Sequence, residues 1–206
     1  MDNTIEAKSF PSFQQLLCEE PIIILENPKT DNYKILKEKI LSENFPWFYS
    51  EYTTDDVSDV LYESKTTEEY RNIPFFTHCL VERPSSVFPV SKVTSYDIQL
   101  YTECINEIAK HNEFRINVIY RMNVNRTIYN GSSLYTMPHV DHDFPHNNLL
   151  IYLTEVTGGE IKVYKNEKWH IYKPLEDEIV MFNGLHCHKT AQKPNEHRVA
   201  IVTTFI

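Results

Sequence analysis

The 206-residue sequence lacks paired cysteines, long apolar runs and an apolar leader. Its four cysteines are dispersed and form no C-x-x-C pair, which excludes the disulfide framework of small secreted domains and favours a reducing, intracellular setting. No apolar run approaches the ~18 residues of a membrane span. The N-terminus MDNTIEAKSF has neither the basic region nor the apolar core of a secretory signal. These absences predict a soluble, cytoplasmic protein without a membrane partner.

Basic residues are also scarce, with 20 Lys and Arg against 29 Asp and Glu and a formal net charge of −9. This excess works against attraction to phosphate backbones, so a nucleic-acid partner is not expected. The 41% apolar content is ordinary for a globular protein, and no repeats or low-complexity segments interrupt it. We expect one domain, in which residues 1–112 supply N-terminal helices and supporting strands and residues 113–206 form a β-rich core.

The first half of the chain mixes helical and strand patterns. Residues 31–45 carry an apolar stripe at helical spacing, and PIIIL just before them is typical of a short buried strand. Thr94-Ser-Tyr-Asp97 has the form of a capping box, and the apolar spacing that follows predicts a helix ending near His111. The segments FPWFYSEY and PFFTHCLVE indicate aromatic strands, and residues 53–69 between them indicate a surface loop or short helix.

The second half is a series of short segments rich in Val, Ile, Tyr and Thr, separated by turn signals such as Thr157-Gly-Gly and Lys193-Pro-Asn. The predicted strands are FRINVIYRM, LYTMPHV, NLLIYL, GEIKVY, KWHIY, EIVMF and HRVAIVTTFI. Evenly spaced strands of this length favour an antiparallel sandwich or barrel, of which the jelly roll is the commonest host for a ligand. The fold class expected is therefore α+β, with a jelly-roll barrel and flanking N-terminal helices.

Metal-capable side chains crowd the stretch MPHVDHDFPHNN. His139 and Asp141 lie two residues apart at the end of a predicted strand, where alternate residues point to the same face. A third ligand has to come from elsewhere, and His186 and His188 are the candidates. Two imidazoles and one carboxylate on one face of an octahedron leave three open positions, which is the donor set of non-haem Fe(II) oxygenases.

Arg198 follows His188 by ten residues and begins the final predicted strand, sharing a face with Ala200, Val202 and Thr204. A guanidinium buried in an apolar barrel needs a partner, and the carboxylate of a bound organic acid matches its fork best. A metal site and an acid clamp are thus predicted from one arrangement.

The order His139-x-Asp141, Gly158-Gly159-Glu160, His188 and Arg198 resembles the 2-oxoglutarate- and Fe(II)-dependent dioxygenases of the prolyl 4-hydroxylase-like group, in particular small stand-alone microbial and viral members. The resemblance implies a double-stranded β-helix, a jelly-roll or cupin-like barrel. It implies iron held by His139, Asp141 and His188, with His188 chosen over His186 for its spacing to Arg198. Arg198 would bind 2-oxoglutarate, and Tyr129, Tyr152 and Ile161 would line that pocket.

The same resemblance implies the chemistry: molecular oxygen and 2-oxoglutarate are consumed, succinate and carbon dioxide are released, and a C–H bond is hydroxylated. The acceptor expected is a prolyl or other side chain of a protein or peptide. Two features depart from related branches. Thr204 stands where alkylated-base repair enzymes usually carry a second arginine, and Lys162, which would replace Arg198 in JmjC-like enzymes, is expected to point outward because Ile161 points inward.

Simpler interpretations compete with each of these. His142, His146, His170 and His197 are expected to be surface or hydrogen-bonded structural residues, although His142 and Asp143 could orient the first ligands. Two other classes of protein remain open. One is a cupin-like zinc or manganese protein of another activity, and the other is a non-catalytic binding barrel; the open positions of a three-ligand set disfavour the latter.

Overall fold

The computed structural model describes residues 19–51, 74–85, 89–128, 135–136, 138–155, 158–185, 188–190 and 197–206, of which 188–190 are described by their backbone alone. Tyr129, His186 and the segment 53–69 lie outside the described residues. In the part of the chain that is described, no helix has both the length and the apolar character needed to cross a membrane.

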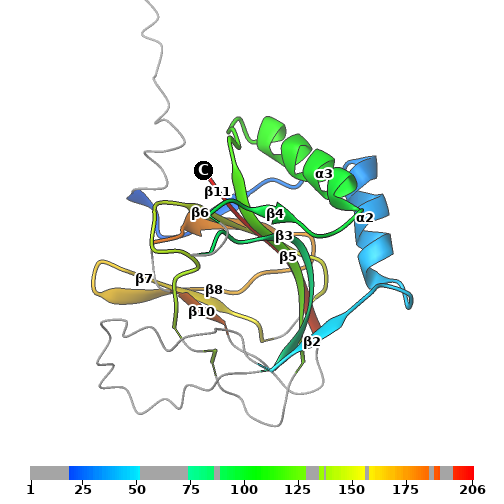
Figure 1. Cartoon of the computed structure of the whole chain (residues 1–206). Coiled ribbons are helices and arrows are strands. Elements are labelled where there is room, and N and C mark those ends of the chain that lie inside the picture. Colours follow the sequence, from blue (N-terminus) through cyan, green and yellow to red (C-terminus); the bar gives the residue numbers. More distant parts are fainter. Residues whose placement is uncertain are drawn as a thin grey trace, which may run out of the picture.

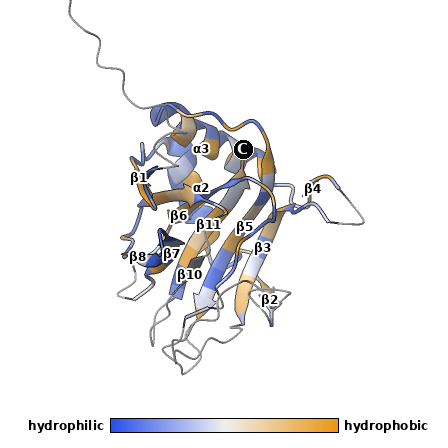
Figure 2. Cartoon of the chain, turned by 90° about the vertical axis from the view of Figure 1, so that its left-hand side faces the viewer, coloured by the Kyte–Doolittle hydropathy of each residue, from blue (hydrophilic) through white to orange (hydrophobic). Residues whose placement is uncertain are grey.

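The described residues form two antiparallel sheets (Figures 1 and 2). The large sheet has the strand order β1-β9-β6-β11-β5-β3-β2, with β4 paired to β3, and the small sheet has the order β10-β7-β8. The strands of the large sheet are β1 (Ile23–Leu25), β2 (Phe48–Ser50), β3 (Phe75–Glu82), β4 (Lys92–Val93), β5 (Ile119–Ile128), β6 (Asn147–Tyr152), β9 (Ile179–Asn183) and β11 (His197–Phe205). Those of the small sheet are β7 (Ile161–Lys165), β8 (Lys168–Tyr172) and β10 (His188–Thr190).

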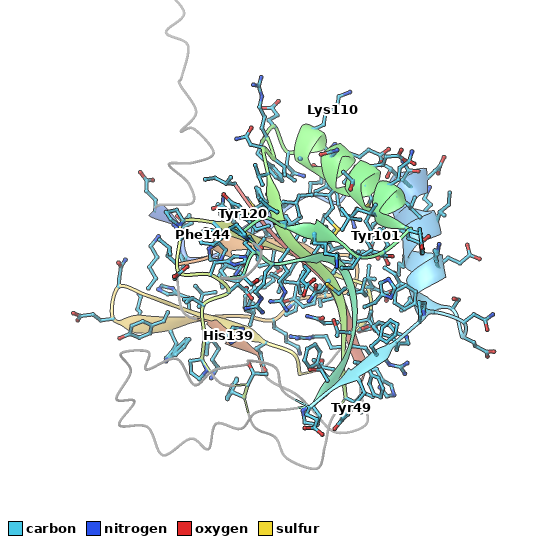
Figure 3. All side chains as sticks on the ribbon, in the orientation of Figure 1. Tyr49, Tyr101, Lys110, Tyr120, His139 and Phe144 are labelled. Atoms are coloured by element: carbon cyan, nitrogen blue, oxygen red, sulfur yellow. The ribbon has the colours of Figure 1, made fainter. Side chains whose placement is uncertain are left out.

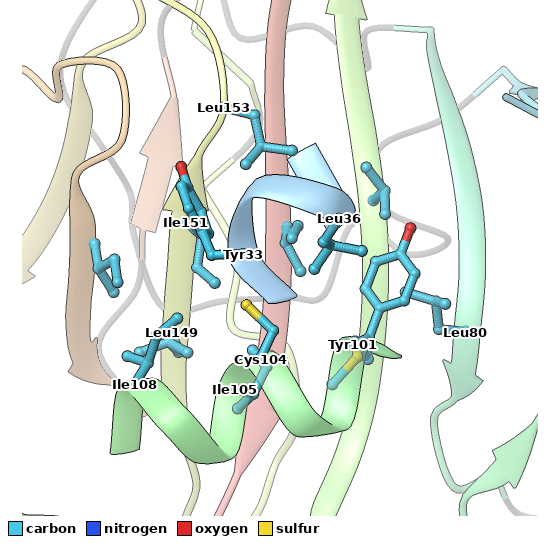
Figure 4. Packing of buried hydrophobic residues seen from close by; sticks show 14 of the residues in the cluster. Tyr33, Leu36, Leu80, Tyr101, Cys104, Ile105, Ile108, Leu149, Ile151 and Leu153 are labelled. Carbon is cyan, nitrogen blue, oxygen red and sulfur yellow. The ribbon is translucent and has the colours of Figure 1, made fainter. Parts of the chain in front are cut away.

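Helices α2 (Asp31–Leu41) and α3 (Ile98–His111) pack on the outer face of the large sheet (Figures 1 and 4). Tyr33, Leu36 and Ile40 form the buried stripe of α2, as its spacing predicts, whereas Leu41, which the same spacing includes, is exposed. They join α3 and the outward-facing side chains of β6 and β11 in one apolar cluster. The helices therefore hold the large sheet from outside and leave its other face to the small sheet.

Two helix ends differ from the sequence-based expectation. Helix α2 ends at Leu41 rather than near residue 45, because Ser42 takes an extended conformation and its N–H caps the Lys39 carbonyl. The capping box before α3 is wrong: Asp97 is the N-cap and makes no side-chain capping bond. The hydroxyl of Thr94 instead donates to the Cys79 carbonyl, and Asp97 pairs with Lys39 at 2.6 Å. Tertiary contacts thus replace the local cap.

A second apolar cluster fills the space between the two sheets. Leu150 and Tyr152 of β6 meet Ile161 and Val163 of β7 there, together with Val180, Phe182 and Ala200. Strand β11 separates the two clusters, since Val199 and Ile201 face the helices and Ala200 faces the small sheet. The alternation predicted for the last strand is therefore the division between the outer core and the barrel interior.

Candidate functional site

Polar side chains interrupt the inner face of the large sheet along two neighbouring strands. In β5 these positions are Arg121, Asn123, Asn125 and Thr127, every second residue of the strand. The register sets Arg198 of β11 directly opposite Thr127, and Thr204 directly opposite Arg121. The polar face of β5 and the inner face of β11 therefore run side by side along the barrel.

A pocket of about 80 Å³ opens on this face. Its lining includes His139, Asp141, Arg121, Asn125, Arg198 and the apolar side chains of Leu150 and Val202. Two of the predicted metal ligands and the predicted acid clamp thus share one cavity, although Asp141 and Arg198 are 57 positions apart in the sequence. The cavity joins two kinds of chemistry, a carboxylate with an imidazole at one end and a guanidinium at the other.

At the first end, the Asp141 side chain is 4% exposed and accepts a hydrogen bond from Nη1 of Arg121 at 2.8 Å. His139 is partly exposed, and its position is labelled in Figure 3. Among the described side chains, no three His, Cys, Asp or Glu converge as a metal site. A third donor would have to come from a residue whose side chain is not described.

Of the two candidates for the distal histidine, His188 has a described backbone, whereas His186 lies outside the described residues. His188 begins β10, and its backbone register sets it directly opposite Val163 of β7. Val163 is fully buried in the cluster between the sheets. The backbone of His188 therefore belongs to the small sheet that closes the barrel.

At the other end of the pocket, Arg198 is held without an ionic partner among the described residues. Its Nε and Nη1 atoms are buried and make no hydrogen bond within the described structure, and the same holds for the Tyr152 hydroxyl. The guanidinium carbon of Arg198 lies 6.0 Å from the centroid of the Tyr152 ring. Burial lowers the pKa of Arg198 and raises that of Tyr152 to about 12. Buried donors that lack partners are typical of a site that binds an anion.

Strand β7 of the small sheet shows the predicted alternation. Ile161 is fully buried in the inner cluster. Lys162 is partly exposed, and its Nζ lies 3.8 Å from the centroid of the Tyr135 ring. Because Ile161 faces inward and Lys162 lies on the opposite face of the strand, the inner face of the small sheet is apolar at this point.

The histidines expected to be structural are bound within the fold. His142 is buried, its Nε2 lies 2.8 Å from the Thr204 hydroxyl, and its ring stacks on Phe144 with centroids 4.7 Å apart. Burial lowers the pKa of His142 to about 4 and lowers that of His146. His146 packs so closely on Gly184 that a Cβ added there would lie 2.1 Å from its Nε2.

His170 Nε2 lies 3.2 Å from the Lys165 carbonyl oxygen, whereas His197 and Asp143 are exposed. Asp143 is therefore a surface residue and is not buried beside the pocket.

Sequence reasoning missed the polar residues of β5. Arg121 and Asn125 line the pocket, and Asn123 is buried between them on the same face. The segment RMNVNRT carries Arg121, Asn123, Asn125 and Thr127 at every second position. This period-two polar pattern, in a strand otherwise destined for a barrel interior, was the available signal.

Comparison with known proteins gives a consistent fold. No protein-family model matches the chain, and no curated protein matches its sequence. Among solved structures, a 2OG-Fe(II) oxygenase family oxidoreductase from Burkholderia pseudomallei superposes with a TM-score of 0.63 at 13% identity, covering 93% of this chain and 88% of that one. A prolyl hydroxylase from Trichoplax adhaerens, in complex with a hypoxia inducible factor peptide fragment, gives 0.58 at 16% identity, covering 93% and 86%.

A Pseudomonas putida prolyl-4-hydroxylase gives a TM-score of 0.53 at 12% identity, covering 93% of this chain and 95% of that one. At such identities the likeness establishes the fold. The predicted α+β architecture with a double-stranded β-helix is therefore confirmed; the described residues form a large and a small antiparallel sheet, with α2 and α3 outside the large one.

Proposed function

We propose that this chain is an Fe(II)- and 2-oxoglutarate-dependent dioxygenase that hydroxylates a C–H bond. In the balanced reaction one oxygen atom enters the acceptor as a hydroxyl group, and the other enters succinate as 2-oxoglutarate loses carbon dioxide. The observation that carries the proposal is the shared pocket, in which His139 and Asp141 lie at one end and Arg198 at the other, with its buried Nε and Nη1 lacking a partner in the described structure. A fold common to oxygenases of this type supports it.

His139, Asp141 and His188 would hold the metal ion. Two imidazoles and one carboxylate suit Fe(II) and leave three coordination positions open. When bound there, Fe(II) would supply the activation of oxygen. The choice of His188 is supported by its register opposite the inward-facing Val163. His186, two residues earlier, is the alternative distal ligand.

Arg198 would bind the distal carboxylate of 2-oxoglutarate. Its buried Nε and Nη1 lack partners in the described structure. Each of them shares an edge of the guanidinium with Nη2, and either edge can bind a carboxylate through two parallel hydrogen bonds. The Tyr152 hydroxyl would donate a further hydrogen bond to this carboxylate, and Tyr129 would add to the pocket. Leu150 and Ile161 would exclude water from the co-substrate, which strengthens each of these interactions.

The acceptor we propose is a prolyl or other side chain of a protein or peptide. Two of the similar structures are described as prolyl hydroxylases, and one of them is in complex with a peptide. The net charge of −9 works against a nucleic-acid acceptor.

Cys79 and Cys104 are free thiols, which agrees with the reducing conditions of a cytoplasm.

The first experiment is anaerobic reconstitution with Fe(II), followed by 2-oxoglutarate, with the visible absorption spectrum recorded at each step. We expect a weak charge-transfer band that needs both components, and succinate after oxygen is admitted. A folded sample that binds metal but gives neither band nor succinate would favour a zinc or manganese protein of another activity. A sample that melts at the same temperature with and without Fe(II) or Mn(II) would favour a non-catalytic barrel.

Variants assign the ligands. His188→Ala should abolish metal binding, and His197→Ala, which alters an exposed histidine beside Arg198, is the matched control and should not. Full retention of metal by His188→Ala, together with loss in His186→Ala, would move the distal ligand to His186. Retention of metal in both variants would refute the three-residue site.

A further inference from the structure

The carboxylate proposed as a metal ligand is already engaged by a buried guanidinium. Nη1 of Arg121 lies 2.8 Å from Oδ1 of Asp141, and the two side chains are 13% and 4% exposed. Removing two charges from water is costly unless their geometry is well defined and their remaining groups are also satisfied. The pair therefore suggests a function that offsets the free energy lost when these two charges are removed from water.

The rest of the Arg121 fork is fixed from its own strand. In the amide orientation of Asn123 that satisfies both groups, its side-chain oxygen accepts from Nη2 and Nε of Arg121 at 2.9 and 3.1 Å. In the same orientation its NH2 donates to the Met122 carbonyl at 2.8 Å. The guanidinium plane is thus set by Asn123 on one edge and presented to Asp141 on the other.

The surroundings leave this guanidinium little choice of position. Arg121 stands directly opposite Thr204 in the β5–β11 register, and the Thr204 hydroxyl is 2.8 Å from Nε2 of His142, the residue that follows Asp141. The segment carrying Asp141 is therefore tied to β11 through His142 and to β5 through Arg121. Both ties act on the part of the segment that lines the pocket.

We infer that Arg121 is a positioning residue, which orients the Asp141 carboxylate toward a metal ion that His139 also binds; the inference rests on the proposed function. Ligating carboxylates are commonly hydrogen-bonded on their outer side, because a carboxylate held in one plane loses less freedom when the metal binds. Arg121 is suited to this, since its planar fork bridges Asn123 and Asp141 at once. A lysine has one donor centre and cannot reproduce that bridge.

A purely structural ion pair makes the opposite prediction. If Arg121 only neutralises Asp141 in the empty site, its removal frees the carboxylate, and metal binding is unchanged or tighter. If Arg121 positions Asp141, its removal weakens metal binding by about 10–100-fold, the usual effect of losing such an outer partner.

The test measures Mn(II) affinity from the loss of the free-ion EPR signal, with Co(II) absorption as a readout of coordination geometry. Arg121→Met should weaken Mn(II) binding by about 10–100-fold and change the Co(II) spectrum. Arg121→Lys keeps the charge, guards against a loss of folding in the first variant, and should show an intermediate loss. Arg83→Met is the matched control, because this exposed arginine donates to the backbone carbonyl of Asp141, at 3.5 Å, and its replacement should leave both readouts unchanged.

Asn123 gives an independent check, because its described contact in this network is with Arg121 rather than Asp141. Asn123→Ala should weaken Mn(II) binding in the wild-type background and have no further effect once Arg121 is Met. An equal effect of Asn123→Ala in both backgrounds would overturn the proposed chain of contacts.

The outcomes separate the two levels of the argument. Wild-type protein that binds neither Mn(II) nor Co(II) would overturn the proposed function and this inference with it. Wild-type protein that binds them, with unchanged or tighter binding in Arg121→Met and wild-type affinity in Arg121→Lys, would overturn the inference alone and leave the proposed metal site intact.

Discussion

Replacing Arg198 with methionine should stabilise the ligand-free protein and remove its response to 2-oxoglutarate. Methionine keeps much of the length and apolar volume of the side chain and removes the guanidinium. In the ligand-free fold, Nε and Nη1 of Arg198 are buried without partners in the described structure. The wild-type protein therefore carries a free-energy cost that a bound acid relieves.

The magnitude follows from those two nitrogens. A buried donor left unsatisfied costs about 1–3 kcal/mol, and the lower end applies here because the pocket is large enough to admit water. Removing both donors should raise the free energy of unfolding by about 2 kcal/mol. For a domain of this size that corresponds to an increase in Tm of about 4–8 °C.

The assay is thermal melting with Mn(II) present throughout, with and without 2-oxoglutarate. At a ligand concentration of about 100 times Kd, the wild-type protein should gain about 2.7 kcal/mol, whereas Arg198→Met should gain almost nothing. The order of the two melting temperatures should therefore reverse when 2-oxoglutarate is added.

Arg126→Met is the matched control. Arg126 also has a buried Nε without a partner among the described residues, but its guanidinium lies over the Trp47 ring, with the guanidinium carbon 5.9 Å from the centroid. Its replacement should leave the response to 2-oxoglutarate intact. An Arg198→Met protein that melts below the wild type and still responds to 2-oxoglutarate would refute both the strain and the assigned role.

Three further predictions concern other parts of the fold. Gly184→Ala should lower the free energy of unfolding by about 1–3 kcal/mol, because the new Cβ would meet the His146 ring, and denaturant melts should find this cost smaller in a His146→Ala background. Although partial burial opposes it, hydrogen bonds from Lys37, Tyr33 and Lys29 lower the pKa of Asp177 to about 2. This pairing contributes stability above the unfolded pKa of about 3.8, and the contribution is lost as the pH falls toward 2. Asp177→Asn should therefore be less stable than the wild type at pH 7 by about 1–2 kcal/mol, and chemical melts should show the difference closing between pH 4 and pH 2; a constant difference would contradict the assignment. Tyr152→Phe should raise the Kd for 2-oxoglutarate about tenfold, the loss of one hydrogen bond, while Mn(II) titration should find metal affinity unchanged.

Much of the secondary structure was predictable because its signals are local. The stripe of Tyr33, Leu36 and Ile40 indicated α2, and α3 was expected to end near the His111 at which it ends. The alternation of the last strand correctly divided Ile201 from Ala200 between the two cores. The predicted capping box failed because Thr94 and Asp97 bond to Cys79 and Lys39, residues that no local pattern connects with them.

The candidate site likewise has features that the sequence predicts and features that depend on the tertiary structure. The sequence by itself determined the chemical inventory: His139 and Asp141 two positions apart, a distal histidine, and Arg198 at the head of a strand. Only the tertiary structure decided that Asp141 meets Arg121, and that Arg198 is buried near Tyr152 without a partner in the described structure. Side-chain alternation is a property of a single strand, whereas cross-strand neighbours depend on register, and register is set by the packing of the whole sheet.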